Sequence, residues 1–258
     1  MKCPQAAIFD LDDTLAESFR PPTSGMVTKL RTLLDLMPIA IMTAAGFARI
    51  ENQFLSELAD SSFISRLYVF PNSTAECYVY KNKAWEIAYS ESLTKDERLS
   101  ITEAIRESIA ETETFPAHPK YEPMIIDRDA QIAFAALGLD ASLEEKQSWD
   151  PDKAKRKKLV TVLEKKIPQF EILMGGMTTI DITRKNVNKA YGVRWLSERL
   201  GIPTSEMLYV GDALYPGGND EVVIATGIQT RSVTGPDKTQ IVIDELVKVC
   251  NKKINASN

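Results

Sequence analysis

Short apolar segments that end in polar residues recur along the chain, and each has the length and composition of a buried strand. Such segments cover residues 6–11, 39–43, 67–72 and 207–212. Strands that are apolar throughout are typical of a parallel sheet with helices on both faces. Ligands in sheets of this kind bind at the carboxyl ends of the strands, so the polar residues at those ends are the first candidates for chemistry.

Helical spacing of apolar residues predicts helices between and after these strands. They cover residues 27–37, which stop before Pro38, then 50–58, 189–201 and 239–250. Gly201 followed by Pro203 is a usual stop signal for the third of them. With a last strand at 227–233, this alternation predicts the α/β class and a Rossmann-like core with a parallel sheet.

The middle of the chain has a different pattern. We predict long strands at residues 78–89, 123–137 and 171–183, with helices near 95–111 and 151–166. Long strands in succession favour an α+β unit around an antiparallel sheet. The sequence therefore predicts an inserted domain at 83–184 between two core segments, 1–82 and 185–258.

A run of basic residues at 153–158 lies on the second helix of the predicted insertion. Acidic residues stand just before it, and Leu159, Val162 and Leu163 follow at helical spacing. The run is most simply the solvated face of an amphipathic helix, and no nucleic-acid binding is expected there.

Composition narrows the classes of function. The 258 residues carry a net charge of −5 with a pI near 5.2, which gives no support to binding of nucleic acid or an anionic membrane. No apolar run is long enough to span a membrane, and no signal peptide is visible at the N-terminus. We expect a protein that is neither secreted nor inserted in a membrane.

The cysteines and the histidine suggest no chemistry. Cys3, Cys77 and Cys250 are odd in number and widely spaced, so neither a disulfide framework nor a zinc site is expected, in keeping with a cytoplasmic protein. His118 stands in a turn-like stretch with no nucleophile-elbow pattern elsewhere, and we interpret it as incidental.

Carboxylates follow the first strand closely. Asp10 and Asp12 are two residues apart, so both can point to the same side as the strand ends. Two carboxylates so close repel each other unless a cation or a shared proton intervenes. One could attack phosphorus while the other transfers a proton, with Mg²⁺ offsetting the repulsion from phosphate. The alternative is a solvated acidic turn.

Two further residues are candidates because of where they stand. Thr43 ends the second strand, and the small-residue loop after it leads into a helix whose first N–H groups could bind an anion. Lys189 lies near the start of a helix, where a cation opposes the helix dipole, so it could hold negative charge in a site. Taken singly, Thr43 is more simply a turn residue and Lys189 a surface lysine.

A second acidic group follows the strand at 207–212. Asp212 ends that strand, and Gly217 and Gly218 allow the chain to turn so that Asn219 and Asp220 come back toward it. Asp and Asn oxygens are the hard ligands that Mg²⁺ prefers. The two strand-end clusters therefore predict one shared magnesium site, although each alone could be an acidic turn.

These motifs together resemble those of the haloacid dehalogenase (HAD) superfamily of phosphotransferases. The match consists of Asp10-Leu-Asp12-Asp-Thr, with Asp13 where Gly is more usual, then Thr43, Lys189, and Asp212 with Asn219-Asp220. The long insertion is similar to the C2-type cap of the Cof-like, class IIB branch. Gly-Asp-x4-Gly-Gly-Asn-Asp, residues 175–181 and residues 232–239 resemble eukaryotic-type phosphomannomutases and related sugar-phosphate phosphatases.

The resemblance implies roles for individual residues. Asp10 would be the nucleophile, Asp12 the acid/base, Thr43 a donor to the phosphoryl group, and Lys189 the cation that holds both. Asp10, the backbone carbonyl of Asp12, and Asp212 would bind Mg²⁺, with Asn219 and Asp220 in support. In the cap, the substrate-binding positions would be Arg128, Gln131, Thr179 and Asp181, and Arg128 suits a bidentate phosphate contact.

One departure favours hydrolysis. The mutases carry further arginines around an Ile-Gly-Arg, whereas the similar stretch at 137–140 is Leu-Gly-Leu-Asp. A mutase must retain a bisphosphorylated intermediate, so we expect a phosphatase for a small phosphorylated metabolite, such as a sugar phosphate. The alternatives are a phosphohexomutase of the phosphomannomutase kind and a noncatalytic sugar-phosphate-binding protein on the same scaffold. A cap-mediated homodimer is conceivable.

Overall fold

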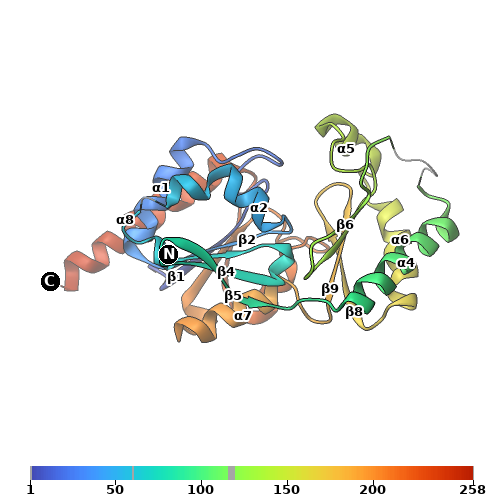
Figure 1. Ribbon diagram of the computed structural model, residues 1–258. Coiled ribbons are helices and arrows are strands. Elements are labelled where there is room, and N and C mark those ends of the chain that lie inside the picture. The colour runs from blue at the N-terminus through green and yellow to red at the C-terminus, as the bar shows by residue number, and fades with distance from the viewer. Residues whose placement is uncertain (1, 60, 116–119, 258) are drawn as a thin grey trace. The chain divides into compact units, whose positions relative to one another are not determined.

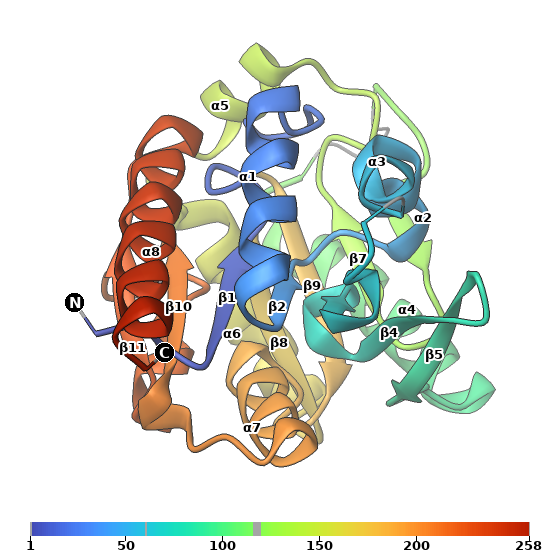
Figure 2. The same cartoon turned by 90° about the vertical axis from the view of Figure 1, so that its left-hand side faces the viewer.

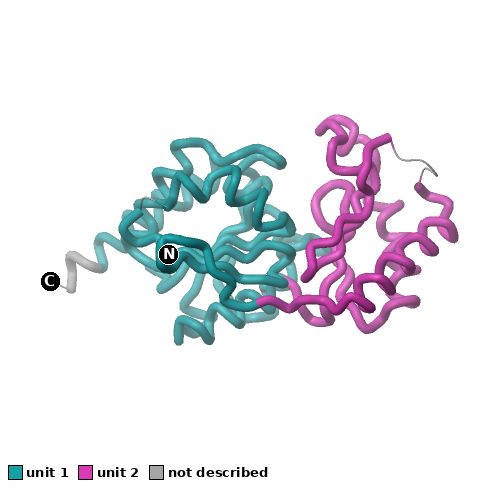
Figure 3. The backbone as a smooth tube through the Cα atoms, in the orientation of Figure 1, with its two compact units in different colours: residues 1–89, 189–258 teal, residues 90–188 magenta. Residues whose placement is uncertain are grey.

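The computed structural model describes residues 2–59, 61–115 and 120–257, which form the two compact units coloured in Figure 3. The larger unit comprises residues 1–89 and 189–258, and the smaller unit comprises residues 90–188. The predicted boundaries, after residues 82 and 184, come a few residues earlier in each case. The first differs because β5 (Ala84–Ser90) is an edge strand of the larger unit's sheet. His118 lies outside the described residues.

The larger unit is built on a sheet to which its described residues contribute seven strands, in the order β11-β10-β1-β2-β3-β4-β5. Figure 1 labels β1, β2, β4 and β5 of this sheet. The five strands from β11 to β3 are parallel to one another, and β4 is antiparallel to β3. This confirms the predicted α/β class with a parallel-rich sheet. The strands are β1 (Ala6–Asp10), β2 (Ile39–Met42), β3 (Leu67–Phe70), β4 (Glu76–Lys81), β10 (Met207–Gly211) and β11 (Gln229–Ser232).

Helices cover both faces of this sheet. Figure 2 shows α1 (Ser24–Leu36) and α8 (Pro236–Ser257) side by side, and their apolar residues share one core with β1 and β2. Thr23 begins α1 by accepting a hydrogen bond from the Met26 N–H. α7 (Lys189–Leu200) packs against the opposite face. None of the described helices is long and apolar enough to cross a membrane.

The segment after β2 is more broken than predicted. The expected helix at 50–58 consists of α2 (Phe47–Ile50), a π-helical turn (Glu51–Leu55) and α3 (Ser56–Leu58). Its apolar residues, including Ile50, Phe54 and Leu58, are buried as their spacing predicts. Short 3₁₀ turns complete the unit, at Ile64–Arg66, Asn72–Thr74, Thr204–Glu206 and Glu221–Thr226.

The smaller unit is an antiparallel sheet with helices packed on its apolar residues. Its described strands follow the order β6-β7-β9-β8, and α4 and α6 share a core with them. The unit contains β6 (Ile125–Asp127), β7 (Ile132–Ala135), β8 (Phe170–Gly175), β9 (Thr179–Arg184), α4 (Lys95–Thr112), α5 (Leu143–Trp149) and α6 (Ala154–Lys166). The sequence pattern did not predict α5, which Ser142 begins with a capping box.

Each of the three long strands predicted for the middle of the chain is two strands. Asn82 and Lys83 both have positive φ, which closes the two-residue turn between β4 and β5. Asp129 and Gly176 have positive φ in the turns that follow β6 and β8. Apolar periodicity continues across short turns, so it did not reveal these reversals.

The expectation that no cysteines pair is wrong. Cys3, just before β1, and Cys250, on α8, form a disulfide, whereas Cys77 is a buried free thiol. The paired residues are 247 positions apart, and only the packing of α8 on the sheet brings them together. The cysteines therefore give no support to a reducing compartment.

Loss of the disulfide should lower the stability of the fold. We expect Cys3→Ser to reduce the free energy of unfolding by about 2 to 4 kcal/mol, because the bridge restricts the unfolded chain. The measurement is urea unfolding with and without a thiol reductant. The reductant should destabilise the parent protein to the same degree and leave the variant unchanged; equal midpoints for parent and variant without reductant would contradict this prediction.

Candidate active site

The polar residues at the carboxyl ends of β1 and β10 lie together. The two strands are parallel neighbours with Phe9 opposite Val210, so Asp10 and Asp212 emerge at the same edge of the sheet. Lys189, the first residue of α7, is buried beside them. The parallel register thus brings together groups that are far apart in the sequence.

Lys189 and Asp220 lie at the centre of this cluster. The Lys189 Nζ is 2.8 Å from Asp10 Oδ1 and 2.6 Å from Asp220 Oδ1. Asp220 also accepts hydrogen bonds from the Tyr209 hydroxyl at 2.6 Å and from the Ala213 N–H at 3.1 Å. Asp220 is therefore fixed by its neighbours, and it holds the lysine against Asp10.

Close packing makes this arrangement depend on glycine. A Cβ added to Gly211 would lie 2.2 Å from Asp220 Oδ2, and one added to Gly218 would lie 2.0 Å from the Ala213 carbonyl oxygen. A larger residue at Gly211 would push Asp220 out of its place, and one at Gly218 would clash with the backbone of Ala213, whose N–H donates to Asp220. The loop folds back as the spacing of its glycines predicts.

Burial and like charge dominate the electrostatics. Burial raises the pKa of Asp10 well above its ordinary value; the Lys189 ammonium opposes this rise, and the Asp220 and Asp212 carboxylates add to it. Burial, then Asp220, raises the pKa of Asp212. For Lys189, burial favours the neutral amine, but the carboxylates of Asp10 and Asp220 outweigh it, so its pKa is raised and the ammonium form is held. More carboxylate than ammonium charge is thus concentrated here.

These residues fit a divalent cation. Asp10, Asp212 and Asp220 can each offer a carboxylate oxygen, and the three atoms lie within 4.8 Å of one another. A hard cation among them would relieve the repulsion that raises the pKa values of Asp10 and Asp212. The predicted ligand set also includes Asn219 and the Asp12 carbonyl, and their participation stays a prediction.

Thr43 is buried at the end of β2, and its Oγ1 accepts a hydrogen bond from the Ala45 N–H at 3.1 Å. That bond fixes the hydroxyl oxygen and leaves its proton to donate. Thr14 is a further hydroxyl in this region, 3.3 Å from Asp212 Oδ1. The assignment of Thr43 to a phosphoryl group stays a prediction.

Asp12 lies in a local arrangement that the sequence did not reveal. Arg49, on α2, binds the Asp12 carboxylate through both terminal nitrogens, at 2.6 and 3.2 Å, and Phe19 N–H donates to it at 3.1 Å. The Arg49 guanidinium also lies over the Phe19 ring. The Asp12 side chain is therefore tied to Arg49 rather than to Lys189. Arg49 follows Thr43 by only six residues. This closeness to a predicted site residue was the signal in the sequence that could have pointed to Arg49.

In the smaller unit, the predicted substrate residues come from neighbouring strands and their turns. Arg128 Nη1 donates to Gln131 Oε1 at 2.9 Å. Thr179 and Asp181 on β9 pair with Ala135 and Ala133 on β7. Asp181 is buried, which raises its pKa to about 7, and the Arg128 charge opposes this rise. Arg128, Gln131 and Asp181 thus form a polar group on one sheet.

The basic run at 153–158 is not wholly solvated as expected, since Arg156 is buried. Arg156 Nε lies 2.9 Å from Asp150 Oδ2, and the two side chains are 2% and 0% exposed. Arg156 Nη1 donates to the carbonyls of Gly175 and Gly176 at 3.1 and 2.9 Å. The Thr179 hydroxyl donates to the same Gly175 carbonyl, so the buried arginine holds the turn that leads to Thr179 and Asp181.

Comparisons with known proteins agree with this architecture. The model of the family "Eukaryotic phosphomannomutase" matches residues 26–249. The phosphomannomutase of Spinacia oleracea is 25% identical over 241 residues, 90% of this chain and 92% of that protein. The probable phosphomannomutase of Caenorhabditis elegans is 24% identical over 93% of this chain and 94% of that protein.

A solved structure confirms the fold. The structure of N-terminal truncated IMP-nucleotidase from Plasmodium falciparum superposes with a TM-score of 0.71 at 17% identity. It covers 95% of this chain and 71% of that one. The predicted HAD-type core with an inserted α+β domain is therefore correct, and at this identity the likeness concerns the fold alone.

Arg156→Met should destabilise the protein by about 3 to 5 kcal/mol, because it leaves the Asp150 carboxylate buried without its cation. Chemical unfolding followed by circular dichroism measures this change. Lys157→Met is the matched control, since Lys157 is an exposed neighbour in the same basic run. Similar losses for the two variants would show that burial of Arg156 has no special weight.

Asp181 should make stability depend on pH. Between about pH 4 and 7 the folded protein keeps a proton on Asp181 that the unfolded chain releases, so the free energy of unfolding should fall as pH rises through this range. Asp181→Asn cannot titrate, so the difference in stability between variant and parent should grow in the variant's favour from pH 4 to 7. A constant difference, measured by thermal unfolding at both pH values, would contradict the raised pKa.

Proposed function

The chain belongs to the eukaryotic phosphomannomutase family, and we propose that it is a phosphohexomutase that interconverts hexose 1-phosphates and 6-phosphates. The observation that carries the proposal is the buried Asp10, with the Lys189 ammonium 2.8 Å from its carboxylate at the end of β1. The match to a phosphomannomutase over nine-tenths of both chains supports isomerisation over the hydrolysis that the sequence predicted.

Asp10 is the proposed nucleophile. A bond forms between an Asp10 oxygen and phosphorus while the bond from phosphorus to the sugar oxygen breaks, and Asp12 gives that oxygen a proton. In the second half of the reaction, another hydroxyl of the sugar attacks the aspartyl phosphate, and Asp12 takes the proton of that hydroxyl. Lys189 holds Asp10 in place and stabilises the charge on the transferring group, to which Thr43 donates a hydrogen bond.

Mg²⁺ fits the donor set of this site. Asp10, Asp212 and the Asp12 carbonyl would hold the ion, with Asn219 and Asp220 in support. When bound, Mg²⁺ supplies positive charge that offsets the repulsion between the carboxylates and phosphate. The raised pKa values of Asp10 and Asp212 support a need for such charge.

Substrate recognition is assigned to the smaller unit. Arg128 would bind the phosphate that does not react, in the bidentate manner that guanidinium favours. Gln131 lies beside it, and Thr179 and Asp181 would bind sugar hydroxyls. The substrate is thus a small sugar bearing at least one phosphate.

Hydrolysis is the second candidate, because of the turn at residues 137–140. The mutases have an arginine where Leu139 stands, and this leucine side chain is 45% exposed. A cap with less positive charge there would hold a bisphosphorylated intermediate less firmly, and water could then accept the phosphoryl group.

A ³¹P NMR experiment separates the two activities. Purified protein with Mg²⁺ and glucose 1-phosphate or mannose 1-phosphate should form the 6-phosphate when a trace of hexose bisphosphate is added, without free phosphate. Accumulation of inorganic phosphate with no 6-phosphate would establish the phosphatase instead. If neither sugar phosphate yields a 6-phosphate or inorganic phosphate, both assignments are contradicted.

Asp10→Asn should abolish turnover while the protein stays folded. The amide cannot act as the nucleophile, and it removes one of the crowded carboxylates, so stability should not fall. Mg²⁺-dependent hydrolysis of p-nitrophenyl phosphate measures the loss, and circular dichroism confirms the fold. Undiminished activity in this variant would rule out the aspartyl-phosphate mechanism.

A further inference from the structure

Arg98 stands at an unusual place on its helix. It lies in the first turn of α4, directly after the capping box formed by Thr94 and Glu97. A cation near a helix N-terminus opposes the helix dipole, where Asp or Glu would be favoured. Some other interaction must therefore offset the cost of Arg98 at this position.

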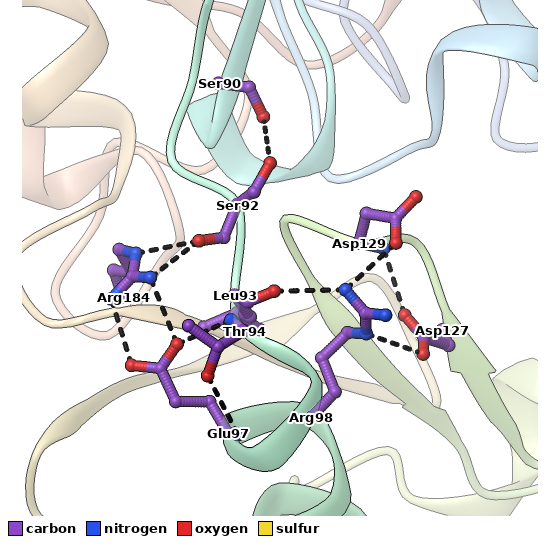
Figure 4. A network of polar contacts seen from close by, with 9 residues as sticks. All are labelled: Ser90, Ser92, Leu93, Thr94, Glu97, Arg98, Asp127, Asp129 and Arg184. Carbon is purple, nitrogen blue, oxygen red and sulfur yellow. Dashed lines mark hydrogen bonds and ion pairs between the residues drawn. The ribbon is translucent and has the colours of Figure 1, made fainter.

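Figure 4 shows what that interaction is. Arg98 Nε lies 3.0 Å from Asp127 Oδ2, and Nη1 lies 3.0 Å from Asp129 Oδ1. Nη1 also donates to the Leu93 carbonyl at 3.0 Å. One guanidinium thus binds two carboxylates, and the two acidic residues stand immediately before and after Arg128.

The turn that carries Arg128 is well defined by hydrogen bonds. Arg128 N–H donates to the Gln131 carbonyl, and Asp129 N–H donates to Asp127 Oδ1 at 3.0 Å. Leu93 N–H donates to the Asp129 carbonyl, which joins the turn to the residue that precedes the α4 cap. Because these three hydrogen bonds hold the turn, the two ion pairs of Arg98 are not needed simply to form it.

The ion pairs of Arg98 change the charge around Arg128. An arginine that binds a phosphate dianion is weakened by carboxylates on both sides, since these repel the phosphate and compete for the guanidinium. The Asp127 and Asp129 side chains are 53% and 75% exposed, so both face water beside Arg128. Arg98 turns both carboxylates toward itself and offsets one of their two negative charges.

We propose that Arg98 is a positioning residue, which binds Asp127 and Asp129 so that Arg128 can bind the phosphate of the substrate. The inference rests on the proposed function, in which Arg128 is a phosphate ligand. In this inference Arg98 does not touch the substrate. It acts by changing the charge around Arg128, which does.

Affinity for glucose 6-phosphate in the Asp10→Asn background tests the inference, because binding is then measured without turnover. Isothermal titration calorimetry should show that Arg98→Met weakens binding by about fivefold, the scale of exposed ion pairs. Adding Asp127→Asn and Asp129→Asn to Arg98→Met should restore the affinity. Arg106→Met is the control, since Arg106 is an exposed arginine on the same helix, and it should leave binding unchanged.

The restored affinity is the result that a merely structural role could not give, because the triple change removes the ion pairs altogether. The loss caused by Arg98→Met should also shrink at high salt, where charge is screened. Unchanged affinity in Arg98→Met, or a triple variant as weak as Arg98→Met alone, would overturn the inference while leaving the proposed reaction intact.

Arg128→Met separates the inference from the proposed function. It should weaken glucose 6-phosphate binding more than Arg98→Met does. If it has no effect, Arg128 is not the phosphate ligand, and the inference fails together with that part of the proposal. Hydrolysis in place of isomerisation by the parent protein would overturn only the mutase assignment, since the affinities do not depend on which acceptor takes the phosphoryl group.

Discussion

The contact of Lys189 with Asp10 and Asp220 is the interaction on which the site depends. Carboxylates buried this closely would favour protonation, and a protonated Asp10 could not act as a nucleophile. The Lys189 ammonium supplies the opposing positive charge, and it is held by Asp220. The Tyr209 hydroxyl and the Ala213 N–H in turn fix Asp220. Any divalent cation adds to a cluster that the protein has already arranged.

The sequence predicted this cluster because parallel topology leaves little freedom. Apolar strands of this length pair in one sheet, and their carboxyl ends meet at one edge. Asp10, Asp212 and Asp220 could therefore be grouped from strand ends and glycine spacing alone. The prediction of Lys189 as a site residue depended more on the family resemblance, because its position at the start of a helix did not by itself exclude a surface lysine.

What the sequence did not predict are contacts that no local pattern encodes. Arg156 looks like its solvated neighbours, and its burial depends on Asp150 and on two carbonyls near residue 175. Arg49 meets Asp12 only because two loops converge. Cys3 and Cys250 meet only after α8 has packed. In each case a partner distant in the sequence, or across a turn, decides the role of the residue.

The choice between isomerisation and hydrolysis depends on how much positive charge the smaller unit presents to a second phosphate. Leu139 supplies none, and the Lys146 ammonium donates a hydrogen bond to the Leu139 carbonyl at 2.9 Å. In the proposed mutase, Arg128 would then be a main source of affinity for a bisphosphate. The ion pairs of Arg98 with the carboxylates beside Arg128 would then matter more to binding, as proposed above. A mutase could tolerate leucine in place of arginine at position 139 if the carboxylates beside Arg128 do not weaken its binding of phosphate.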